Sequence, residues 1–294
     1  VGRMFGPVVL LWFTVLAALG IWQFCRNPQI LLSLSPWEGV AFLQREWSHA
    51  LPILGATFLA VTGGEALYAD LGHFGRKPIR VGWFAVVFPA LALNYLGQAA
   101  LVTLEPQAIR SPFFLMAGPM LVLPLTVLAA LAAIIASQAL ISGAFSLTVQ
   151  AIQLGCLPRC NVRHTSHHER GQVYVPFVNW MLAAGCILLV VTLKTSSALA
   201  GAYGIAISLT MVITSILLIP AARLVLGWAA TTTISVSVLF LSVDLAYLVA
   251  NATKLLHMGW LPLVAAMILI FLMLTWIWGR DRLAKRFAER NLES

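Results

Sequence analysis

Long apolar runs joined by short polar connectors form the dominant pattern along the chain. A helix needs about 20 mostly apolar residues to cross the hydrocarbon layer of a membrane. Eight runs come close to or exceed that length, so the pattern predicts an all-α integral membrane protein with about eight spanning helices. The predicted spans are Phe5–Phe24, Leu51–Asp70, Val81–Thr103, Pro119–Gly143, Phe177–Leu193, Ala198–Ala221, Gly227–Val249 and Gly259–Trp278.

Three connectors contain enough apolar residues to predict structure of their own. Ile30–Trp47 predicts a short outer surface helix, and Glu105–Pro119 predicts another surface element. Phe145–Leu157 has apolar residues at helical spacing and predicts an inward continuation of the fourth span along the membrane interface. Residues 1–279 are therefore expected to form one transmembrane domain, followed by a basic cytoplasmic tail at 280–294.

The composition supports a membrane protein and excludes an ordinary soluble one. Hydrophobic residues make up 61% of the 294 residues and charged residues 10%, whereas a soluble domain carries roughly 25% charged residues. A soluble chain of this length could not bury so much apolar surface in one core. The net charge of +8 lies in the connectors between apolar runs, so we expect membrane lipid, and not nucleic acid, as a partner.

The distribution of Lys and Arg predicts the orientation, because basic residues gather in cytoplasmic connectors. If the N-terminus is cytoplasmic and the spans alternate, 13 of the 18 basic residues fall on the inside. The five on the outside are Arg26, Arg45, Arg110, Lys194 and Lys254. Both ends of the chain are therefore predicted to lie in the cytoplasm.

The second predicted span differs from the others because Gly63 and Gly64 stand directly before an ionisable residue, Glu65. Paired glycines favour local unwinding, and unwound backbone at membrane depth is tolerated where it lines a cavity. Carbonyl groups freed by the break, together with Thr62 and Glu65, predict a site for a monovalent cation. Burial disfavours the charged carboxylate and a bound cation favours it, so Glu65 also suits coupling to protons.

Other readings of these residues stay open at this point. Gly63 and Gly64 could form a packing notch, with Glu65 hydrogen-bonded to a neighbouring helix. Tyr68 and Asp70 are secondary candidates in the same string, and Asp70 could instead cap the next turn or meet Arg76. In the sixth span Gly201, Tyr203 and Gly204 indicate either close helix packing or a phenol placed beside a neighbouring backbone.

The remaining polar residues carry weaker signals. Ser137, Gln138 and Ser142 form a polar stripe in the fourth span, whose hydroxyls are expected to bond back to their own helix. Asp244 in the seventh span is expected at the periphery of the bundle, without a partner that the sequence identifies. A cluster in one connector resembles a zinc site only loosely, and we predict no metal site there. Its members are Cys156, Cys160, His164, His167 and His168.

Four strings resemble the KUP/HAK/KT potassium-uptake permeases in order and spacing. Thr62–Gly75 (TGGEALYADLGHFG) resembles the sixth helix of that family. Pro89–Gln98 (PALALNYLGQ), Ala136–Gly143 (ASQALISG) and Val175–Trp180 (VPFVNW) resemble later helices. The resemblance implies a LeuT-type (APC-like) fold of two inverted repeats, of which this chain would hold helices five to twelve of twelve. The chain also opens at Val1 without an initiator Met, so we expect a longer protein.

The resemblance also implies a function. It implies potassium uptake across the bacterial inner membrane by proton symport. K⁺ and H⁺ would be the transported ions, and no cofactor or other metal is expected. Thr62 and Glu65 match cation-site residues, Glu65 the proton-coupling residue, and Tyr203 the site tyrosine of the tenth helix. A homodimer is one assembly left open. The alternatives are an amino-acid or other cation permease of the same fold, a membrane enzyme, and a non-catalytic assembly subunit.

Overall fold

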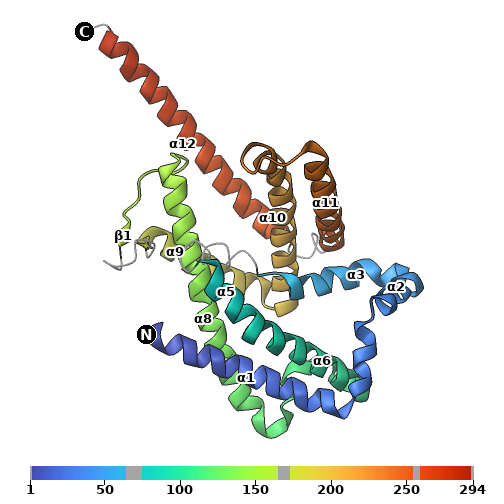
Figure 1. The fold of residues 1–294 in the computed structure, drawn as a ribbon. Helices are drawn as coiled ribbons and strands as arrows, with labels where there is room; N and C mark the ends of the chain where they lie inside the picture. Colours follow the sequence, from blue (N-terminus) through green and yellow to red (C-terminus); the bar gives the residue numbers. More distant parts are fainter. Residues whose placement is uncertain (1, 64–74, 165–172, 254–258, 293–294) are drawn as a thin grey trace. The chain divides into compact units, whose positions relative to one another are not determined.

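The computed structural model describes residues 2–63, 75–164, 173–253 and 259–292, and this part of the chain is almost entirely helical (Figure 1). Seven of its helical segments are long and apolar enough to cross a membrane. They are α1 (Gly2–Arg26), the continuous segment Arg76–Leu104, α8 (Gly118–Gln153), α9 (Pro176–Leu193), α10 (Ser196–Leu224), α11 (Ala230–Ala252) and α12 (Trp260–Leu292). The prediction of an all-helical integral membrane protein is therefore confirmed.

The region predicted as the second span, Leu51–Asp70, is described only in its first part. It begins with α3 (Trp47–Thr57) and continues as a short 3₁₀ helix, η2 (Phe58–Val61). Beyond Gly63 the predicted span lies outside the described residues until Gly75. The third span starts earlier than predicted, because α5 (Arg76–Gly82) and a π-helical turn, η3 (Trp83–Val87), lead directly into α6 (Phe88–Leu104).

The helices fall into two units, which are described separately. In the first unit α1 and α6 lie side by side and make the most extensive helix pair of that unit (Figure 1). They approach through glycine: a Cβ added to Gly97 would lie 2.6 Å from the Cα of Gly20. Small residues at such a crossing let two membrane helices pack backbone against backbone.

Short helical elements connect the spans of the first unit, as the sequence predicts. The first connector forms η1 (Pro28–Leu34) and α2 (Pro36–Arg45), because Ser35 is extended before Pro36 and interrupts the single helix that was expected. The second forms η4 (Pro106–Arg110) and α7 (Pro112–Leu115). Leu101, Ala108 and Met116 make a small buried core beneath these turns.

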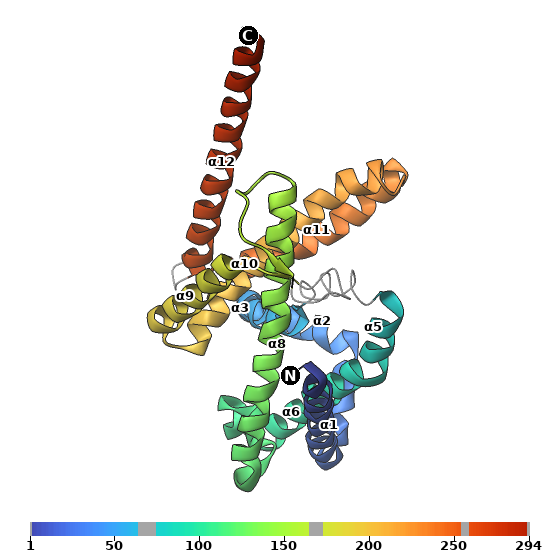
Figure 2. The ribbon, with the colours of Figure 1, turned by 90° about the vertical axis from the view of Figure 1, so that its left-hand side faces the viewer.

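The second unit is organised around the antiparallel pair α10 and α11, which lie side by side in both views (Figures 1 and 2). α3 packs on α11, η2 and α9 contact α10, and α12 meets α10. A two-stranded antiparallel ribbon, β1 (Arg163–His164) and β2 (Val173–Tyr174), precedes α9. α8 itself runs without interruption past Gly143 to Gln153, which confirms the predicted helical continuation of the fourth span.

Candidate functional site

The helix that begins with α3 ends at the residues that the sequence singles out. After η2, Thr62 takes an extended conformation with φ −88° and ψ 172°. Gly63 follows with a φ of 109°, a conformation that only glycine adopts readily. The backbone therefore leaves the helical path at Thr62 and Gly63. Gly64, Glu65, Tyr68 and Asp70 lie outside the described residues.

Two candidate hydroxyl groups lie together at this helix end, although they are 141 positions apart in sequence. The Tyr203 hydroxyl oxygen is 3.5 Å from Thr62 Oγ1, which is longer than the usual O–H···O range of about 2.5–3.0 Å. Thr62 Oγ1 donates its own proton to the Leu59 carbonyl oxygen at 2.9 Å. Tyr203 O–H points to Thr62 Oγ1 as the donor of this long contact, so among the described residues each hydroxyl oxygen keeps at least one lone pair for a shared ligand.

Packing on α10 and α11 sets the positions of these two residues. Phe58, fully buried one turn before Thr62, packs against Tyr247 of α11 with tilted rings whose centroids are 4.8 Å apart. Gly204 is buried against Asn251 of α11, where a Cβ would lie 2.6 Å from Asn251 Oδ1. Close packing on the Gly204 side leaves its neighbour Tyr203 on a more open face, with 43% of its surface exposed.

The described part of the site is neutral and rich in oxygen. Hydroxyl and carbonyl oxygens are the groups that replace the hydration shell of alkali cations in proteins. Within the described residues, no group of three His, Cys, Asp or Glu side chains gathers that could hold a metal ion. Thr62 and Tyr203 thus present two neighbouring hydroxyl oxygens, and the sequence offers Glu65 as a charged residue three positions beyond Thr62.

The structure gives Asp244 a partner that the sequence did not identify. Its side chain is buried, with 4% of its surface exposed, and Ser215 Oγ of α10 donates a hydrogen bond of 2.5 Å to its carboxylate. The carboxylate thus has a partner and lies inside the α10–α11 contact. Ser215 does not stand out in the sequence, although Ser208 and Ser215 are seven residues apart on α10, a spacing that places both on one helix face.

Several other polar candidates lie within the described residues. Ser137 Oγ donates to the Ile134 carbonyl oxygen at 2.7 Å, as predicted for a hydroxyl that bonds within its own helix. Cys156 and Cys160 are free thiols. Two members of their cluster, His167 and His168, lie outside the described residues.

Comparison with known proteins gives a consistent result. Residues 1–281 match the family model described as the K⁺ potassium transporter integral membrane domain. The chain is 50% identical over 292 residues to a probable potassium transport system protein Kup 2 of Chromobacterium violaceum, covering 99% of this chain and 47% of that protein. It is 51% identical over 292 residues to a probable Kup protein of Myxococcus xanthus, covering 99% and 45%.

A third relative, a probable Kup 2 protein of Paramagnetospirillum magneticum, is 52% identical over 286 residues, covering 97% of this chain and 44% of that protein. The chain thus spans about half the length of the curated relatives that it matches. No solved structure shows significant similarity to it.

Proposed function

Because the chain belongs to the KUP family of potassium transporter membrane domains, we propose that the protein containing it takes up potassium across the cell membrane. The relatives are named as potassium transport system proteins, and their similarity extends over nearly the whole of this chain. Membrane-spanning helices supply the necessary setting. The observation that carries the proposal is the approach of Tyr203 to Thr62 at the end of η2.

In this proposal Thr62 and Tyr203 each contribute a hydroxyl oxygen to one dehydrated K⁺ ion. Their oxygens are 3.5 Å apart, so a single ion can contact both. Glu65, only three residues beyond Thr62, supplies the negative charge, and the backbone that leaves the helical path at Gly63 supplies carbonyl oxygens. Tyr68 and Asp70 are second candidates, since they follow in the same string.

Proton symport follows from the same carboxylate. Protonation removes the charge that attracts K⁺, and K⁺ binding favours loss of the proton, so Glu65 links occupancy by the two ions. Moving one positive charge inward gains about 2.3 kcal/mol per 100 mV of membrane potential. We place the site at the interface of two inverted repeats of a LeuT-type fold, which would rock around it to give alternating access.

The same proposal includes the setting of the protein. Both ends of this chain lie on the cytoplasmic side of a bacterial inner membrane, as the distribution of basic residues favours. K⁺ and protons are its ligands, lipid surrounds it, and no cofactor takes part. A homodimer is compatible with this arrangement.

Rescue of a potassium-uptake-deficient bacterium at low external K⁺ tests this function. The complete gene is expressed with Glu65 intact or as Glu65→Gln, and equal membrane insertion is verified by immunoblotting. Growth with Glu65 and none with Glu65→Gln is expected. Equal growth would remove Glu65 from the mechanism, and no growth with a well-inserted parent protein would refute potassium uptake.

A further inference from the structure

The segment Arg76–Leu104 begins with a basic cluster that the transport proposal does not use. Arg76, Lys77 and Arg80 lie within five residues, and all three are exposed. None of them forms an ion pair with another described residue. This end of the helix therefore carries three positive charges that are not neutralised by the described part of the protein.

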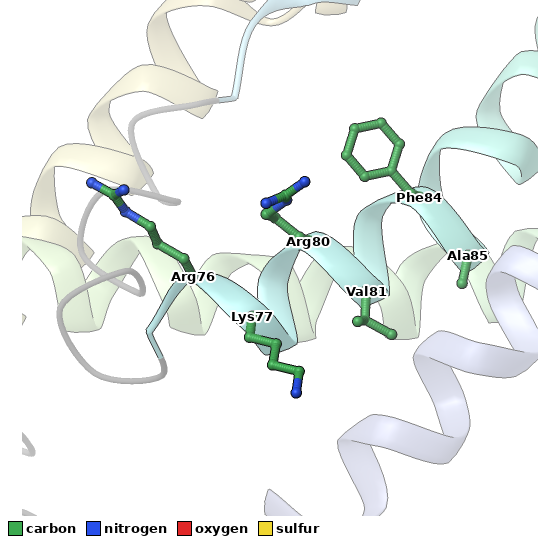
Figure 3. Close-up of a pocket in the computed structure, with 6 residues that line it drawn as sticks. All are labelled: Arg76, Lys77, Arg80, Val81, Phe84 and Ala85. Atoms are coloured by element: carbon green, nitrogen blue, oxygen red, sulfur yellow. The ribbon is translucent and has the colours of Figure 1, made fainter.

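The cluster is one end of an open groove of about 590 Å³. Figure 3 shows its lining as two rows on the helix, each stepping by four residues. The rows are Arg76, Arg80 and Phe84, and Lys77, Val81 and Ala85. Both change from basic to apolar in the same direction, and from Arg76 to Phe84 the helix rises about 12 Å.

The apolar end of the groove is exposed to the surroundings of the helix. Val81 is 60% exposed and Phe84 63% exposed. Trp83 and Phe88 add two further exposed rings beside them, 6.3 Å apart between centroids. Exposed aromatic residues next to basic ones are typical of the layer where lipid headgroups meet acyl chains. The π-helical turn Trp83–Val87 lies at this level, and such turns often occur at functional sites.

We propose that this groove binds an anionic phospholipid. Its phosphate contacts Arg76, Lys77 and Arg80, and the beginning of an acyl chain covers Val81 and Phe84. A free phosphate ion would satisfy the charges and leave the apolar residues uncovered, whereas a phospholipid matches both ends of the groove. Basic pockets on the cytoplasmic side of membrane helices recognise lipid headgroups through this combination.

Native mass spectrometry of the protein expressed from its complete gene tests the proposal. Phosphatidylglycerol, phosphatidylcholine and inorganic phosphate are titrated separately into delipidated protein. The test variant replaces Arg76, Lys77 and Arg80 by Gln, and the control replaces Arg282, Lys285 and Arg286, three exposed basic residues of α12, by Gln. The control removes the same charge from another predicted cytoplasmic segment and tests whether position or net charge matters.

We expect the parent to prefer phosphatidylglycerol over phosphatidylcholine, and the test variant to bind phosphatidylglycerol roughly 100-fold more weakly. The control should stay within about twofold of the parent. If the triple variant does not fold, Arg80→Gln alone should weaken binding about fivefold. Equal binding by parent and variant, an equal loss in the control, or displacement of phosphatidylglycerol by millimolar inorganic phosphate would each overturn the proposal.

Discussion

The α1–α6 crossing gives a prediction whose size follows from two distances. In Gly97→Ala the new Cβ would lie 2.6 Å from Gly20 Cα and 2.7 Å from Gly20 O. Non-bonded carbon atoms prefer about 3.5–4.0 Å, so the helices must separate by about 1 Å. The atoms in the way belong to backbone and cannot rotate aside. Overpacking of this kind costs about 1–3 kcal/mol.

A matched control separates the steric effect from helix propensity. Replacing glycine by alanine inside a helix gains about 1 kcal/mol of propensity in either variant. A Cβ at Gly185 in α9 meets no atom within 4 Å, so Gly185→Ala keeps this gain without a clash. The free energy of unfolding of Gly97→Ala should therefore be about 1–3 kcal/mol below that of Gly185→Ala.

Equilibrium unfolding of the purified protein in lipid bicelles, titrated with a denaturing detergent, measures this difference. Circular dichroism of each variant under native conditions verifies that both begin from the same helical content. If Gly97→Ala proved as stable as Gly185→Ala, the close approach of α1 and α6 would be incorrect.

Three further changes test other contacts. Ser215→Ala removes the donor to the buried Asp244 carboxylate, and unfolding should become easier by about 1–3 kcal/mol; unchanged stability would mean that the bond is not formed. Gly204→Ala places a Cβ 2.6 Å from Asn251 Oδ1, which should displace the neighbouring Tyr203 and raise the KM for K⁺. An unaltered KM would contradict the idea that this packing positions Tyr203. Gly63→Ala imposes a φ of 109° on alanine and should lower the free energy of unfolding by about 1–3 kcal/mol; no change would show that the residue relaxes.

The sequence predicts the spanning helices well because each is a local property. A run such as Ala198–Ala221 must be apolar along its full length to lie in lipid, and α10 contains this run. The continuation of α8 beyond Gly143 is also local, since residues 145–153 keep helical spacing. The boundaries of the spans are predicted less accurately. α5 extends the third span to Arg76, because exposed basic residues can continue a helix outside the apolar layer.

Contacts between helices could not be predicted in the same way. Asp244 was recognised as an unusual carboxylate, but its partner Ser215 lies 29 residues away on another helix. Which face of α10 meets α11 depends on packing around Gly201 and Gly204. Because apolar residues occur throughout both helices, the sequence pattern does not identify this face. Thr62 and Tyr203 were paired through resemblance to a family, because spacing alone relates no residues 141 positions apart.

The kinetics of K⁺ uptake test the central claim most directly. Initial rates are measured against external K⁺ for the parent protein, Thr62→Val, Tyr203→Phe and the double variant, at equal amounts in the membrane. Each single change removes one hydroxyl oxygen and should raise KM about fivefold. In the double variant the increase in KM should be smaller than the product of the two single increases, because both oxygens contact one ion. An unchanged KM in both single variants would contradict a potassium site at Thr62 and Tyr203.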